Sequence, residues 1–254
     1  MRVVVLASGS EGSACLVAAG GARLLIDAGI AARTLERKLA ALGIPRLDGV
    51  LVTHAHADHI GHAARIAARQ RVPIFATEAT RRASGLDPDT VSSISSREPF
   101  ELRGLLISPC PIPHDQAQIA VKVQRGGRSV AVVTDLGEPT GVLVDHLAGV
   151  ELLLIEANHD PDMLANGPYP PSLKRRVGSA RGHLSNAQCA EIVRRTTAST
   201  VVLMHLSRAN NRADLARAVV ADAIPKRRNT KLLVAPARGV VPLQTKLHQT
   251  SFAF

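Results

Sequence analysis

Aromatic side chains are nearly absent from this 254-residue chain, which has no Trp, one Tyr and four Phe. Proteins that hold single-stranded nucleic acid without sequence preference stack successive bases on aromatic rings. The composition therefore argues against such a stacking platform. If nucleic acid is the ligand, we expect the protein to grip it mainly through its backbone.

Long apolar runs are also missing. No stretch approaches the roughly 18 consecutive apolar residues that a membrane span requires, and the opening segment MRVVVLASGS has no run that would serve as a secretory signal. We expect a cytoplasmic protein without a membrane partner. The three cysteines, Cys15, Cys110 and Cys189, are odd in number and scattered among small or apolar neighbours. This pattern predicts buried, reduced thiols rather than disulfides.

Acidic residues are outnumbered. Thirty-one Lys and Arg against 21 Asp and Glu give a net charge of +10, which favours phosphate-bearing partners. The charge is also compatible with a basic protein that binds no nucleic acid, so the partner has to be inferred from specific motifs.

Short β-branched or leucine-rich runs recur along the chain and predict strands, many of them too continuously apolar to have a wet face. These runs lie at 2–8, 14–20, 22–29, 48–54, 72–77, 105–114, 119–125, 128–137, 151–157, 200–207 and 231–237. Helical patterns lie between several of them, at 32–43, 59–70, 185–196 and 210–224, with Gly43 as a stop for the first. Buried strands alternating with amphipathic helices indicate a layered α/β protein.

One segment, residues 159–181, departs from this alternation. It is rich in proline and in basic side chains, so a regular element through its whole length is not expected. It fits either a solvated excursion or a functional loop. The basic cluster at 226–231 is interpreted as a turn between a helix and a strand.

The motif LVTHAHADHIGH, residues 51–62, carries four histidines and an aspartate. His54 and His56 follow a buried strand, and their spacing of two points both rings the same way from extended backbone. Asp58 and His59 come where the chain turns into a helix. Imidazole suits zinc, and a carboxylate admits manganese as well. Two neighbouring ligand clusters in one turn can serve two metal ions, and His62 falls outside this pattern.

Two ions need further ligands, which we expect at the ends of other strands. His114, Asp135 and His205 are each the first polar residue after a buried apolar run. A single histidine at a strand end is usually structural, but three such residues in succession are not readily explained that way.

A His-x-His-x-Asp-His motif after a strand, followed by His, Asp and His at later strand ends, resembles the metallo-β-lactamase fold superfamily. The resemblance implies a four-layered αββα sandwich, here a single domain over residues 1–254, with two divalent metal ions, Zn²⁺ or Mn²⁺. Carried over by position, His54, His56 and His114 would hold one ion, Asp58, His59 and His205 the other, and Asp135 would bridge them. Asp27, in LLIDAG, would orient the metal loop.

The superfamily includes thioesterases, lactamases, oxidases and nucleases, so the fold does not name the substrate. Three further segments, LASGSEGSACLV, IEANHDPDMLANGPYPPSLKRRVGSARGHLS and MHLSRANN, resemble the bacterial YycJ (WalJ) branch. That branch is regarded as a DNA exonuclease. The resemblance implies a dinuclear phosphodiester hydrolase in which the ions supply hydroxide at neutral pH and Asp58 orients or deprotonates the attacking water.

The segment GHLS is similar to the Gly-His-Ser-Thr segment of tRNA 3′-processing endonucleases, although this chain has Leu184 in place of the Ser. That similarity makes His183 the acid that protonates the leaving oxygen, with Glu156 orienting it. A buried pair between Glu156 and an arginine is an equally fair reading. The residues expected to contact substrate phosphates are Lys174, Arg175, Arg176, Arg181, Ser8 and Ser10.

Other functions stay open. They are a thioester or lactone hydrolase of the glyoxalase II type, an RNA-processing enzyme or cyclic phosphodiesterase, and a non-enzymatic metal-dependent regulator. DNA is favoured over RNA as partner. An open cleft could gain a missing wall from a homodimer, but the sequence does not determine the oligomeric state.

Overall fold

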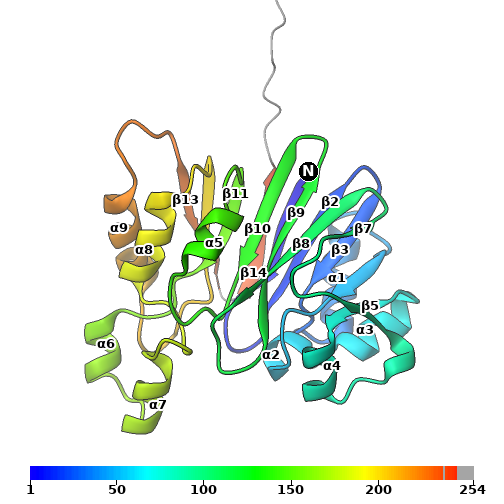
Figure 1. Ribbon diagram of the computed structural model, residues 1–254, viewed down its shortest axis with the longest axis horizontal. Coiled ribbons are helices and arrows are strands. Elements are labelled where there is room, and N and C mark those ends of the chain that lie inside the picture. Colours follow the sequence, from blue (N-terminus) through cyan, green and yellow to red (C-terminus); the bar gives the residue numbers. More distant parts are fainter. Residues whose placement is uncertain (237, 245–254) are drawn as a thin grey trace, which may run out of the picture.

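Two seven-stranded mixed sheets lie face to face in the computed structural model, which describes residues 1–236 and 238–244 (Figure 1). The first sheet has the order β14-β1-β2-β3-β4-β5-β6. Its strands are Arg2–Ala7 (β1), Ala14–Ala19 (β2), Ala22–Ile26 (β3), Gly49–Leu51 (β4), Ile74–Thr77 (β5), Val91–Ile94 (β6) and Arg238–Gln244 (β14). Strands β3 to β6 are mutually parallel.

The second sheet has the order β13-β12-β11-β10-β9-β8-β7. Its strands are Phe100–Leu102 (β7), Leu105–Ile112 (β8), Gln118–Arg125 (β9), Arg128–Val133 (β10), Leu152–Glu156 (β11), Thr200–Met204 (β12) and Lys231–Val234 (β13). Strands β10 to β13 are parallel. In open sheets, ligands bind beyond the carboxyl ends of such strands.

Helices cover the outer face of each sheet. The helices are Ala32–Ala41 (α1), Ala57–Ile60 (α2), Ala63–Gln70 (α3), Glu78–Ser84 (α4), Gly141–His146 (α5), Pro161–Asn166 (α6), Pro171–Val177 (α7), Asn186–Arg195 (α8) and Ala213–Ala223 (α9). In Figure 1, α1 and α3 lie outside the first sheet, and α5, α8 and α9 outside the second. One hydrophobic cluster joins the two inner sheet faces, and one more lies under the helices on each side. The predicted four-layered αββα sandwich is confirmed.

The eleven predicted strand runs all contain a strand, although the last run ends at residue 237, outside the described residues. Most of these strands are apolar enough to be buried on both faces, whereas β13 is half-buried or exposed along its length. The helix predicted at 59–70 is instead two helices, α2 and α3, separated at Gly61 and His62. Short elements without a clear apolar period were missed, namely α4, α5, β6, β7 and β14. No helix among the described residues is long and apolar enough to cross a membrane.

The proline-rich segment 159–181 forms two short helices, α6 and α7, rather than one excursion. Each helix has proline at its first position, Pro161 and Pro171, where proline's missing N–H costs nothing and its fixed φ favours a helical turn. The expectation that no single element spans this segment is therefore confirmed, but an entirely irregular loop would be wrong.

The cysteines are all free and buried, as predicted. Burial raises the pKa of the Cys15 and Cys189 thiols, so neither is a reactive thiolate at neutral pH.

Candidate metal centre

The predicted ligands meet at one edge of the sandwich, where strands of both sheets end. Their donor atoms form overlapping groups, in each of which all ligand atoms lie within 4.8 Å of one another. One group is His54, His56 and His114, a second is Asp58, His59 and His205, and a third is His54, His59 and Asp135. A fourth group adds two residues to Asp135 and His205, namely Glu156 and His183. The structure thus brings together the two triads that the sequence suggested, with Asp135 next to members of both.

Three buried polar atoms in these groups have no hydrogen-bond partner. They are His59 Nε2, His205 Nε2 and Asp135 Oδ2. His59 Nε2 lies 2.8 Å from Asp135 Oδ2, so the ring nitrogen and the carboxylate oxygen face each other at ion-pair distance. Leaving buried polar atoms unpaired is costly. Imidazole nitrogens and a carboxylate oxygen converging in this way fit a divalent cation such as zinc or manganese.

A buried carboxylate, Asp27, fixes the turn that carries the first motif. Its Oδ1 accepts hydrogen bonds from the Thr53 backbone N–H at 2.9 Å and the Thr53 hydroxyl at 3.0 Å. Its Oδ2 lies 2.7 Å from His59 Nδ1. Because Nδ1 of His59 is hydrogen-bonded to Asp27, Nε2 is the ring nitrogen that faces the cluster. Gly29 is needed nearby, because a Cβ there would lie 1.7 Å from the Asp58 carbonyl oxygen.

The charges at this turn are strongly coupled. Burial lowers the pKa of His59, but Asp135 and Asp27 outweigh it and raise the pKa to about 10. For His54, burial and the neighbouring His59 together lower the pKa to about 2. Without a cation, a proton is therefore held on His59 at neutral pH, where it compensates the two buried carboxylates.

Glu156, the last residue of β11, connects two histidines. Its Oε1 lies 2.7 Å from His205 Nδ1 and 2.8 Å from His183 Nδ1. Its Oε2 accepts hydrogen bonds from the backbone N–H groups of Leu136 and Leu184. Burial raises the pKa of Glu156, but the two histidines outweigh it and lower the pKa to about 2. The expected contact with His183 is present, and the contact with His205 is one that the sequence did not suggest.

His183 is partly accessible, with 19% of its side chain exposed. Burial lowers its pKa, but Glu156 and Asp135 outweigh burial and raise it. The neighbouring carboxylates therefore favour the protonated ring, whose Nδ1 lies 2.8 Å from Glu156 Oε1.

Three residues of the site adopt a left-handed backbone that is rare for side chains other than glycine. Asp27, Asp135 and His205 have φ of 61°, 54° and 55°. Each directly or nearly follows a strand, so the unusual φ turns the side chain into the cluster. Ser8 supports one of these turns, because its hydroxyl accepts a hydrogen bond from the His205 N–H at 2.8 Å.

The two serines expected at substrate phosphates lie in different environments. Ser8 is 3% exposed, so its contact with the His205 backbone favours a structural role over contact with substrate. Ser10 is exposed and remains available at the surface.

Asp115 is a residue of the site that the sequence did not reveal. Its Oδ1 lies 3.1 Å from His56 Nε2 and 3.2 Å from His114 Nε2. Its Oδ2 accepts a hydrogen bond from Arg176 Nε at 2.9 Å. The only available signal was its position directly after His114.

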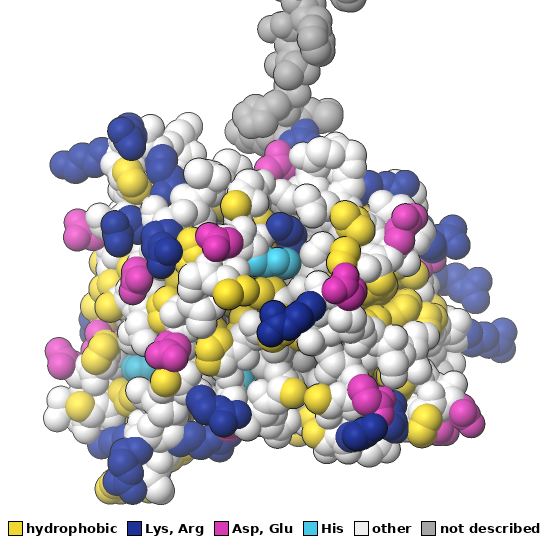
Figure 2. Space-filling view, in the orientation of Figure 1, with side chains coloured by type: hydrophobic (Ala, Val, Ile, Leu, Met, Phe, Trp, Pro, Cys, Tyr) yellow, Lys and Arg dark blue, Asp and Glu magenta, His cyan; other side chains and the backbone are white. Residues whose placement is uncertain are grey.

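The four basic residues expected to hold phosphates differ in how they are engaged. Arg176 pairs with Asp115, Lys174 donates to the Ala165 carbonyl and Arg181 Nε donates to the His114 carbonyl at 2.8 Å. Arg175 is exposed. Figure 2 shows basic side chains gathered at the lower left, where α7 lies in Figure 1.

Comparison with known proteins is consistent with this geometry. Residues 22–206 match the model of the beta-lactamase superfamily domain. The chain is 31% identical to exodeoxyribonuclease YycJ of Bacillus anthracis, over 88% of this chain and 89% of that protein. It is 32% identical to exodeoxyribonuclease WalJ of Streptococcus pneumoniae, over 84% of each.

Solved structures share the fold. The metallo-β-lactamase fold protein YhfI from Bacillus subtilis superposes with a TM-score of 0.76 at 19% identity, over 95% of this chain and 98% of that one. Zn²⁺-bound PqqB from Methylobacterium extorquens gives 0.72 at 18% identity, over 96% of this chain and 100% of that one.

The fold and the histidine and aspartate clusters at its edge define a metal-dependent hydrolase. The chain belongs to the beta-lactamase superfamily and, within it, to the branch that contains YycJ and WalJ.

Proposed function

We propose that this protein is a DNA exonuclease that hydrolyses phosphodiester bonds with two divalent metal ions. The observation that carries the proposal is the contact between Glu156 and His183, whose side chains converge with Asp135 and His205. A histidine that can donate a proton thus lies directly at the candidate metal centre. The exodeoxyribonuclease names of the relatives that align over most of the chain favour DNA as the substrate.

The proposed ligands divide as the two triads do. His54, His56 and His114 would hold one ion, and Asp58, His59 and His205 the other, with Asp135 between them. Bound cations of this kind neutralise charge on phosphate oxygens and make water acidic enough to act as a nucleophile at neutral pH.

Asp58 has a second role in this proposal. Its Oδ2 lies 3.7 Å from both His59 Nε2 and His205 Nε2, and 24% of its side chain is exposed. It is the one carboxylate of its triad, and solvent reaches it more easily than it reaches the two histidines. We assign it the task of orienting the attacking water and accepting its proton.

His183 would protonate the departing sugar oxygen. A general acid has to be protonated at the operating pH, and Glu156 and Asp135 favour that state by raising the pKa of His183. Glu156 does not touch substrate in this proposal, because it is fully buried. It acts as a positioning residue that holds the Nδ1 atoms of His183 and His205.

Basic side chains next to the centre would hold the DNA backbone. Arg175 is exposed to solvent, whereas Arg176 shares its charge with Asp115. Arg181 is fixed at the edge of the cluster by its bond to the His114 carbonyl. Contacts of this kind position the strand and carry no sequence information, as suits an exonuclease.

The test is a time course on 5′-labelled and 3′-labelled DNA, single-stranded and duplex, with Mn²⁺, Zn²⁺ or a chelator. We expect metal-dependent release of mononucleotides from one end. His183→Gln should lower kcat by about 10²–10⁴-fold, the usual contribution of a general acid. The control is His146→Gln, which replaces a histidine at the end of α5, outside the ligand groups.

A glutathione thioester assayed in parallel separates this function from a thioesterase. Asp58→Ala should abolish turnover while the far-UV spectrum and the unfolding transition stay those of a folded protein. Failure to cleave any DNA in the presence of bound metal would refute the nuclease proposal. Efficient thioester hydrolysis would replace it.

A further inference from the structure

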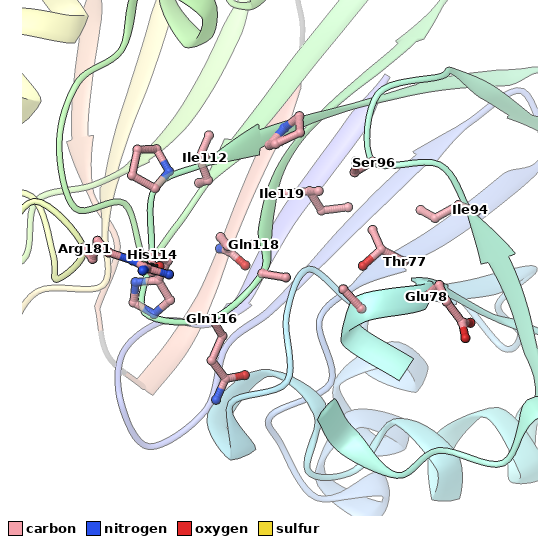
Figure 3. Close-up of a pocket in the computed structure, with 14 residues that line it drawn as sticks. Thr77, Glu78, Ile94, Ser96, Ile112, His114, Gln116, Gln118, Ile119 and Arg181 are labelled. Atoms are coloured by element: carbon pink, nitrogen blue, oxygen red, sulfur yellow. Dashed lines mark hydrogen bonds between the residues drawn. The ribbon is translucent and has the colours of Figure 1, made fainter. Parts of the chain in front are cut away.

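A cavity of about 690 Å³ adjoins the metal centre on the side of His114. It lies between the β8–β9 connection and the segment where β5 leads into α4, as Figure 3 shows. His114 and Arg181 close one end, and Thr77, Ile94 and Ser96 lie opposite. The volume falls within the range of roughly 300–1,000 Å³ typical of small-molecule sites. The hydrolytic mechanism proposed above makes no use of this space.

The cavity wall next to His114 contains a hydrogen-bond acceptor that no group of the described residues donates to. Gln118 is 4% exposed, and its Nε2 donates to the Thr134 carbonyl at 2.7 Å. That bond fixes the orientation of the amide, because only the NH₂ side can face a carbonyl. Gln118 Oε1 is buried and has no partner, and the same holds for Gln116 Oε1. Both residues line the cavity.

The remaining lining is mostly aliphatic. It includes Pro111, Ile112, Pro113 and Ile119. A flat, partly apolar group could therefore pack against these side chains while its polar edge reaches Gln118. Such a ligand would be held without aromatic stacking, which agrees with the scarcity of aromatic residues in the chain.

The one carboxylate in the lining does not oppose an anionic ligand. Glu78 forms ion pairs with Arg81 and Arg82, each at 2.7 Å, and in Figure 3 its carboxylate points away from Gln118 and His114. At the other end, Arg181 adds a positive charge next to the metal centre. The cavity therefore suits a ligand whose phosphate lies at the His114 end and whose neutral part lies deeper.

We propose that this cavity receives the terminal nucleobase of the strand being hydrolysed, with an N–H of the base donating to Gln118 Oε1. The inference rests on the proposed nuclease function and adds a base-binding subsite to it. All four DNA bases carry at least one N–H on the edge that pairs in a duplex, so an acceptor wall accommodates each of them. A base can enter only when it is unpaired, which predicts preference for a single-stranded or frayed end.

The experiment compares two oligonucleotides that differ only at the terminal nucleotide, which carries cytosine in one and an abasic tetrahydrofuran in the other. We expect the wild-type protein to release the base-bearing nucleotide at least about fivefold faster, the scale of one hydrogen bond together with some apolar contact. Ala79→Trp places a large side chain at the cavity, since Ala79 is exposed and lines it. In this variant the ratio of the two rates should fall to about one.

Ala83→Trp is the matched control. Ala83 is also exposed and lies one turn further along α4, outside the cavity lining, so this variant should keep the wild-type ratio. Equal rates for the two substrates in the wild-type protein would overturn the base-binding inference and leave the nuclease function standing. So would an unchanged ratio in Ala79→Trp with its fold intact.

A binding measurement separates failure of the subsite from failure of the nuclease. Deoxycytidine 5′-monophosphate and deoxyribose 5-phosphate are titrated into the protein by calorimetry. If neither oligonucleotide is hydrolysed, the proposed function falls. Tighter binding of the nucleotide that Ala79→Trp abolishes would then still support the subsite, and equal or absent binding would overturn it.

Discussion

Replacing Ser8 by alanine tests whether the backbone of His205 is held in place by one buried hydrogen bond. Ser8 and His205 are 3% exposed each, and the Ser8 hydroxyl is the acceptor for the His205 N–H. The bond closes a contact between residues that are 197 positions apart. At φ 55°, His205 occupies a conformation that costs of the order of 1–3 kcal/mol unless its surroundings enforce it.

The expected loss of stability follows from the His205 N–H, which would lose its acceptor. Ser8→Ala removes one oxygen, too little to open a cavity, but it leaves a buried N–H unpaired at a cost of about 1–3 kcal/mol. For a protein of this size that corresponds to a fall in Tm of roughly 2–12 °C. The measurement is thermal and urea unfolding of the chelated protein, so that bound metal does not mask the effect. We also expect weaker metal binding, because His205 presents its Nε2 to the cluster through this turn.

Ser10→Ala is the control, since Ser10 is exposed on the same loop and should unfold as the wild type does. If Ser8→Ala were as stable as Ser10→Ala and bound metal equally well, the contact would not hold His205. The case for Ser8 as a structural residue would then fail, and direct contact between Ser8 and substrate would become the better explanation.

Three further outcomes are expected. Asp27→Asn should weaken metal binding about 10–100-fold, because Asn keeps the acceptor for Thr53 but turns an NH₂ toward His59. Competition with a zinc chelator measures this change in affinity. Asp48→Asn, outside the ligand groups, is the control and should have no effect. Metal affinity of the wild type should rise with pH up to about 10. The pKa of His59 in the folded protein is raised to about 10, and its proton has to leave before Nε2 can bind a cation. Calorimetry in buffers of different ionisation enthalpy would detect the released proton. Arg175→Ala should weaken DNA binding and reduce its salt dependence by about one counterion. The loss of affinity should be larger than that caused by alanine at the ion-paired Arg176. Equal losses in filter binding would contradict the role of Arg175 as the freer phosphate contact.

The sequence predicted the layers of the fold because most of the strands are buried on both faces and form distinct apolar runs in the sequence. It also predicted which polar residues meet at the strand ends, since each of His114, Asp135 and His205 follows such a run and joins the cluster. The elements it missed, such as α4 and β7, are short and half-exposed, so no apolar period marks them. The division at Gly61 within a continuous helical pattern was also missed, because it goes with backbone hydrogen bonds that join His59 and His62 to the distant Ala28.

The site was predicted less evenly. The ligands of the first motif are close together in the sequence, so their spacing of two or three residues is enough to predict that their side chains meet. The contacts around it are not local: Asp27 reaches His59 over 32 positions and Ser8 reaches His205 over 197. No periodicity records such pairings. Ser8 looked like a substrate ligand because it lies in a glycine-rich turn, and only its burial and its hydrogen-bond partner indicate a structural role.

Glu156 shows why this site behaves as one unit rather than as a set of separate ligands. A single carboxylate oxygen lies within 2.8 Å of the Nδ1 atoms of both His183 and His205. His205 is proposed to bind a metal and His183 to donate a proton, so one buried charge fixes the tautomers needed for binding and for leaving-group protonation. Glu156→Gln would present an NH₂ to both rings, because its other oxygen has to accept two backbone N–H bonds. We therefore expect that variant to lose metal affinity and general-acid catalysis together, whereas His183→Gln should lose only the second.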